Sequence, residues 1–85
     1  MNVQTTRPFE RDYARLPEAL KDLVDKQLSL LLSNPRHPSL GLKRIQGTRG
    51  LWEARVSRSH RLTLEIVGET YILRRVGTHD VLNQP

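Results

Sequence analysis

Apolar and polar residues alternate along three short runs in the last third of the chain. Residues 52–56 read WEARV, residues 60–67 read HRLTLEIV, and residues 70–76 read TYILRRV. Alternation with a period of two is typical of β-strands that bury one face. The links between the runs are only three and two residues long, which predicts a three-stranded antiparallel meander. One face of this sheet is predicted to be apolar, and the other carries arginines.

Two helices are predicted before the meander. Residues 3–5 suit a short first strand, after which Thr6 can cap a helix with Pro8 in its first turn. Three residues at helical spacing give this helix one apolar side: Phe9, Tyr13 and Leu16. A second helix is predicted over residues 17–33, and the following Asn-Pro pair ends it. Its apolar stripe consists of Leu20, Leu23, Val24, Leu28 and Leu31.

These elements predict an α+β fold with the order β-α-α-β-β-β. The sheet is small and mostly antiparallel, and both helices cover its apolar face. A chain of 85 residues supports one modest core, so residues 1–85 are expected to form a single domain. Residues 36–51 are the least regular part, and three apolar residues there are expected to return to the core: Leu40, Leu42 and Ile45.

The last run of the meander carries two neighbouring arginines, Arg74 and Arg75. Adjacent residues of a strand point to opposite faces, so only one of the two can join the arginines of the other strands. Strict alternation places Arg75 on the polar face and leaves Ile72 and Val76 for the core.

Composition narrows the chemistry that is available. The sequence has no cysteine, which excludes disulfides and thiolate metal ligands. Its three histidines, at positions 37, 60 and 79, do not have the spacing of a metal site, so neither a metal nor another cofactor is expected. The longest apolar stretch, residues 30–32, is far too short to span a membrane, and there is no apolar run like that of a signal peptide. A cytoplasmic location without membrane contact is expected.

The net charge of +5 is confined to one part of the chain. Residues 1–35 contain five basic and five acidic side chains, whereas residues 36–85 contain nine basic and four acidic ones. A basic half-chain suits a polyanion, either a nucleic acid or an acidic protein. The alternative is an ordinary solvated surface that happens to be basic.

One histidine stands out as a candidate for proton transfer. His79 follows the last predicted strand, where it can approach a ligand, and the ordinary pKa of histidine suits acid–base chemistry near neutral pH. Arginine forks match phosphate oxygens, so several arginines on one sheet face beside a histidine would suit a phosphodiester. The alternative for His79 is a surface or capping role.

The order of elements and several local motifs resemble the RelE/ParE superfamily of toxins from bacterial toxin–antitoxin pairs. The motifs are FERDYARL at residues 9–16, the Asn-Pro pair at 34–35 with PSL at 38–40, WEARV at 52–56, HRL at 60–62 and GTHD at 77–80. The resemblance covers essentially the whole chain. The Gly-Thr-His ending is similar to that of YafQ-like ribosome-associated endoribonucleases, although residues 81–85 lack the aromatic residue that many relatives place after the histidine.

The resemblance implies a metal-independent endoribonuclease that cleaves mRNA, expected to be ribosome-bound, and so inhibits translation. The ribose 2′-OH would attack the adjacent phosphate. By position, Arg61 matches the arginine that holds the scissile phosphate, Arg55 a basic position on the preceding strand, and His79 the acid or base of the terminal segment; Glu53 is a possible base. Contacts to RNA or the ribosome are expected from Lys43, Arg44, Arg49, Arg58, His60 and Arg75.

The same resemblance implies protein partners and two alternatives. A cognate antitoxin would neutralise the toxin, and the complex of the two would bind operator DNA. ParE-like gyrase poisons share the fold without ribonuclease chemistry, so a toxin that inhibits gyrase or another target by binding is the first alternative. The second is a decayed homologue that binds RNA weakly through charge alone.

Overall fold

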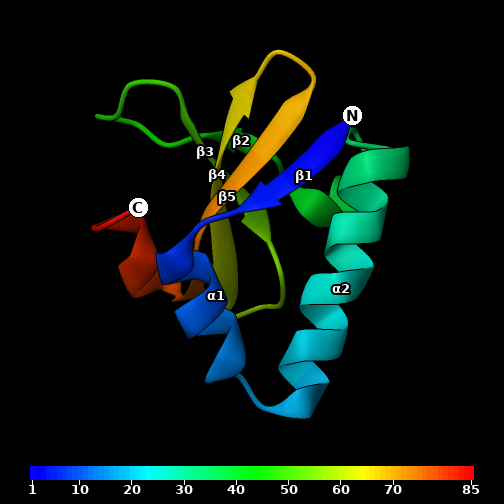
Figure 1. Cartoon of the computed structure of the whole chain (residues 1–85), viewed down its shortest axis with the longest axis vertical. Helices are drawn as coiled ribbons and strands as arrows, with labels where there is room; N and C mark the ends of the chain where they lie inside the picture. The colour runs from blue at the N-terminus through cyan, green and yellow to red at the C-terminus, as the bar shows by residue number, and fades with distance from the viewer.

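The computed structural model describes residues 1–85 and is built around one five-stranded sheet (Figure 1). The strands are β1 (Asn2–Thr5), β2 (Lys43–Arg44), β3 (Leu51–Arg55), β4 (His60–Val67) and β5 (Thr70–Thr78). Their order across the sheet is β1-β5-β4-β3-β2, with β1 parallel to β5 and all other pairs antiparallel. The predicted α+β order and the meander are confirmed, and β2 adds a short fifth strand at the edge.

Both helices lie on the same side of the sheet (Figure 1). Helix α1 (Arg7–Ala14) begins as predicted, because Thr6 Oγ1 accepts a hydrogen bond from the Phe9 N–H at 3.3 Å. Helix α2 (Glu18–Ser33) starts directly after Pro17, which cannot donate a main-chain hydrogen bond and so suits a helix start. Neither helix has the length and hydropathy of a membrane span.

The core lies between the helices and the sheet. Its buried members come from every layer: Phe9, Val24, Leu31, Leu40, Ala54, Val56, Leu62, Leu64, Tyr71, Leu73 and Val76. As predicted, Leu40 and Ile45 are buried and Leu42 packs against the core. The stripe predicted for α2 is wrong at Leu23, which is 36% exposed, and the helix buries Gln27 instead.

A β-bulge in β5 changes which side chains face the core. Thr63 is opposite Arg75 and Leu64 is opposite Leu73, so Arg74 is an extra residue in the ladder. Tyr71 and Leu73 therefore face the helices before the bulge, and Val76 does so after it. The prediction that Ile72 belongs to the core is wrong, because the strict alternation behind it does not survive the inserted residue.

The polar face, which is the sheet face turned away from the helices, is partly covered by the end of the chain. A 3₁₀ helix, η2 (His79–Leu82), follows β5 and buries Val81 against the sheet. Thr63 is fully buried on this face, where its hydroxyl donates to the Pro85 oxygen at 3.3 Å. The C-terminal segment, residues 79–85, is thus a packed part of the fold.

Candidate functional site

Two arginines lie directly opposite each other on the polar face. Arg55 ends β3, and the register pairs it with Arg61 on β4. The Cβ atoms of such opposed residues are roughly 4.5–5.5 Å apart, and like charges in this position repel. Neither arginine takes part in any of the three ion pairs of the structure. A bound anion would relieve this repulsion, which makes the pair a candidate phosphate site.

The guanidinium of Arg61 is held in place by the turn between β3 and β4. Its Nη1 atom donates to the carbonyl oxygens of Ser57 at 2.7 Å and His60 at 2.9 Å. Nε and Nη2 have no hydrogen-bond partner. These two donors form one side of the guanidinium fork, which is the side that binds two oxygens of a phosphate at once.

His79 lies at the same end of the polar face as the two arginines. The register places Gly77 opposite Arg61, and His79 begins η2 two residues later. Val81 packs closely on Gly77 of β5 and so holds this helix against the strand. A Cβ atom added to Gly77 would lie only 3.0 Å from Val81 Cγ1. The His79 side chain is exposed, and neither nitrogen of its ring has a hydrogen-bond partner in the protein.

Glu53 lies on the polar face, next to the pair of Arg55 and Arg61. It is half-buried on β3, between Lys43 of β2 and Thr63 of β4, and it shares its face with Arg55 two residues further on. The structure therefore brings Glu53, Arg55 and Arg61 onto one surface, at the end of the sheet where His79 emerges. No group of three histidine, aspartate or glutamate side chains is arranged to hold a metal ion.

The remaining predicted site residues are more scattered. Lys43, Arg49 and Arg58 are exposed and form no ion pair. The guanidinium carbon of Arg44 lies 5.3 Å from the centre of the Trp52 ring, a cation–π contact. His60 alternates with Arg61 and so belongs to the opposite sheet face, where its Nδ1 atom contacts the Ser59 hydroxyl at 2.9 Å.

The structure uses Arg75 differently from the RNA contact predicted for it. Asp12 of α1 accepts hydrogen bonds from Arg75 Nε at 2.6 Å and from Nη2 at 3.2 Å. The hydrogen bond to Asp12 raises the pKa of the Arg75 guanidinium above its ordinary value. With two of its donors bound to a carboxylate, Arg75 acts first as a link between α1 and the sheet.

Gln27 is a residue near the site that the sequence pattern does not reveal. Its Nε2 atom donates to the main-chain oxygens of Arg55 at 2.9 Å and Ser39 at 3.2 Å. Strand β2 ends its pairing at Glu53, so the outer edge of β3 at Arg55 lacks a strand neighbour, and the amide of Gln27 covers it. The only sign of this role in the sequence is that a polar residue occupies a position in the apolar period of α2. That sign is weak, because glutamines are usually exposed.

Solved structures with the same fold include several bacterial and archaeal toxins. YafQ from E. coli strain BL21(DE3) superposes with a TM-score of 0.80 at 17% identity, over 95% of this chain and 96% of YafQ. A YoeB/ParE toxin from Agrobacterium tumefaciens gives 0.78 at 16% identity, over 93% of this chain and 99% of the toxin. A chain of the RelB–RelE antitoxin–toxin complex from Methanococcus jannaschii gives 0.72 at 20% identity, over 94% of both chains.

No protein-family model matches this sequence, and neither does any curated protein. At these identities the structural similarity concerns the fold. The predicted RelE-like fold is confirmed, and YafQ is among the solved structures that share it.

Proposed function

We propose that this protein is the toxin of a toxin–antitoxin pair and that it cleaves mRNA, expected to be ribosome-bound. The observation that carries the proposal is the opposed, unneutralised pair of Arg55 and Arg61 at the end of the polar face where His79 is exposed. The fold shared with YafQ and with the RelE and YoeB/ParE toxins supports the same assignment. The cellular location that goes with it is the cytoplasm.

The reaction needs two proton transfers and cationic stabilisation, and no metal ion. The 2′-oxygen attacks the adjacent phosphorus, the bond from phosphorus to the 5′-oxygen breaks, and the products are a 2′,3′-cyclic phosphate and a 5′-hydroxyl. Glu53 can accept the proton of the 2′-OH as a carboxylate, and His79 can give one to the leaving oxygen as an imidazolium. Arg61, supported by Arg55, stabilises the charge that builds on the phosphate oxygens.

Binding of the wider RNA and ribosome surface falls to the exposed basic residues around the site. Lys43 and Arg44 belong to the edge strand β2, Arg49 follows in the loop, and Arg58 lies in the turn next to Arg61. Contacts of this kind attract a polyanion without selecting a sequence, and they weaken as salt is raised.

An antitoxin is the expected protein partner. The M. jannaschii RelE protein was solved as an antitoxin–toxin complex. Here α1 and α2 flank an apolar hollow of about 270 Å³ whose lining includes Phe9, Tyr13 and Leu28, and Leu23 and Leu32 of α2 are exposed. A partner that covers these residues would bury apolar surface, and the complex would bind operator DNA.

The decisive experiment is single-turnover cleavage of mRNA on programmed ribosomes, with binding measured separately. His79→Ala should slow cleavage by about a hundredfold to ten-thousandfold and leave binding almost unchanged, because its contribution is proton transfer. Arg61→Ala should weaken both binding and cleavage, and Lys43→Ala should weaken binding alone, with a smaller effect at high salt. Arg15→Ala, on the exposed end of α1, is the control for loss of a positive charge.

Cleavage by His79→Ala at the wild-type rate would remove the histidine from the mechanism. Growth arrest with intact mRNA and accumulating cleaved DNA would instead favour the gyrase-directed alternative. The C-terminal segment gives that alternative a specific basis, since residues 81–85 offer no aromatic side chain to a base and Val81 is buried against the sheet. Weak RNA binding with neither effect would indicate a decayed homologue.

A further inference from the structure

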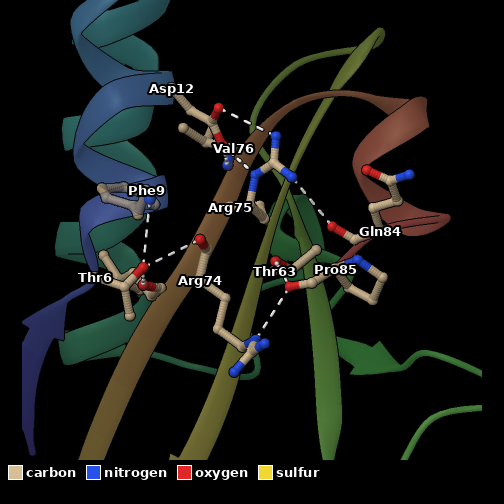
Figure 2. Close-up of polar contacts among 10 residues, drawn as sticks. Thr6, Phe9, Asp12, Thr63, Arg74, Arg75, Val76, Gln84 and Pro85 are labelled. Carbon is tan, nitrogen blue, oxygen red and sulfur yellow. Dashed lines mark hydrogen bonds and ion pairs between the residues drawn. The ribbon is translucent and has the colours of Figure 1, made fainter.

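A carboxylate of α1 closes the open edge of the last strand (Figure 2). Strand β1 stops pairing with β5 at Leu73, so the rest of that edge has no strand neighbour. Asp12 takes its place: Oδ2 accepts from the Val76 N–H at 3.1 Å and from Arg75 Nε at 2.6 Å, and Oδ1 accepts from Arg75 Nη2 at 3.2 Å. The Asp12 side chain is only 14% exposed, so water screens these contacts little.

The same guanidinium reaches the C-terminal segment on its other side. Arg75 Nη1 donates to the Gln84 main-chain oxygen at 3.3 Å. The next residue is held as well, because the Pro85 oxygen accepts from Arg74 Nε at 3.1 Å and from the Thr63 hydroxyl (Figure 2). The bulge makes this possible, since it lets two consecutive arginines bond to residues that lie over the same face.

These contacts place His79 in a segment whose two ends are both held on β5. The chain leaves β5 at Thr78, His79 begins η2, Val81 packs on Gly77, and Gln84 returns to Arg75 of the same strand. Asp12 in turn holds the Arg75 guanidinium to which Gln84 bonds. If Asp12 released Arg75, the guanidinium that holds Gln84 would be free to move, and only the contacts of Pro85 with Arg74 and Thr63 would still hold that side of the C-terminal segment.

We propose that Asp12 is a positioning residue that sets the location of His79 through Arg75 and residues 83–85. This inference rests on the proposed RNA cleavage, in which His79 transfers a proton. Proton transfer requires heavy atoms within hydrogen-bond reach, and a displacement of about 1 Å can cost about a hundredfold in rate. Asp12 itself is not placed to touch the RNA, because its two carboxylate oxygens are bound to Arg75 and Val76.

Two measurements on the full chain test the proposal. Asp12→Asn removes the charge and one acceptor with little change in shape. Hydrogen exchange in residues 79–85 should become at least about tenfold faster, while β4 keeps its protection. Single-turnover cleavage should fall about tenfold to a hundredfold with RNA binding within about twofold of wild type. Asp12→Glu, which restores the carboxylate, should recover part of the rate.

Glu10→Gln is the matched control. It removes one negative charge from the same helix, but Glu10 is exposed and bonds only to the Thr5 hydroxyl. Both exchange and cleavage should stay at wild-type values. If Asp12→Asn loosens the whole sheet, the Arg75→Lys variant tests the proposal instead. A lysine amine can reach one partner but cannot bond to Asp12 and Gln84 at the same time, as the arginine does. Its exchange and cleavage should then follow the pattern expected for Asp12→Asn.

Several outcomes would overturn the proposal. Cleavage of RNA by Asp12→Asn at the wild-type rate would show that the link to His79 is unimportant. If Asp12→Asn does not fold, the same result with Arg75→Lys would show it. Unchanged exchange in residues 79–85 would show that Asp12 does not hold the C-terminal segment at all. A wild-type protein that leaves RNA intact would refute the ribonuclease function instead, and the exchange result would still decide whether Asp12 positions this segment.

Discussion

Replacing Gln27 by alanine tests whether one buried amide holds three elements together. Gln27 is 5% exposed, and both hydrogens of its amide are used, one for the Arg55 oxygen on β3 and one for the Ser39 oxygen in the 3₁₀ turn η1 (Pro38–Leu40). The alanine variant would lose both hydrogen bonds, leave two main-chain acceptors without this donor, and open a small cavity between α2 and the sheet.

The expected loss follows from these three effects. A net hydrogen bond contributes about 1 kcal/mol, and leaving a buried acceptor unpaired costs about 1–3 kcal/mol. Because the turn can relax toward water, we expect Gln27→Ala to lower the free energy of unfolding by about 2–3 kcal/mol. For a chain of this length each kcal/mol lowers the midpoint temperature by about 4–8 °C, so the midpoint should fall by about 8–24 °C.

Urea and thermal unfolding, followed by circular dichroism, measure both quantities. Gln46→Ala is the control, since Gln46 is exposed and makes no side-chain hydrogen bond, and surface changes of this kind stay within about 0.5 kcal/mol. Gln27→Leu separates the two causes, because it refills the cavity without restoring a donor, and it should recover only part of the loss. A Gln27→Ala variant as stable as the control would refute the bridging role of Gln27.

Two further predictions concern Tyr13 and Gly77. The hydrogen bond from the Tyr13 hydroxyl to Asp25 Oδ1, at 2.8 Å, raises the pKa of Tyr13 above its ordinary value of 10.0. The stability that this bond adds over Tyr13→Phe should therefore be present at neutral pH and disappear as the pH rises through the raised pKa of Tyr13. Asp25→Asn should move the tyrosinate absorbance titration back toward its ordinary range, because Asp25 is the largest cause of the rise. Gly77→Ala should push η2 away, because the new Cβ lies 3.0 Å from Val81 Cγ1, and it should slow RNA cleavage more than it weakens RNA binding. Equal loss of both would instead indicate general disruption of the fold.

The sequence alone determined the elements whose signals are local. The period of two in the meander, the short links between its strands and the cap at Thr6 each depend on residues a few positions apart, and all three agree with the structure. The candidates Arg55 and Arg61 also follow from this local alternation, because a strand without irregularities keeps its faces. The structure pairs them across two strands, as the predicted meander requires.

Only the tertiary structure decided how the two ends of the chain meet. The bulge at Arg74 shifts the register of β5, so Tyr71 and Leu73 rather than Ile72 enter the core, and alternation along a single strand carries no sign of an inserted residue. Asp12 and Arg75 are 63 positions apart, and their pairing depends on the point at which β1 leaves the edge of β5 open. Periodicity reports the environment that a residue needs, whereas the partner that satisfies a charged side chain is fixed by which distant segments pack together.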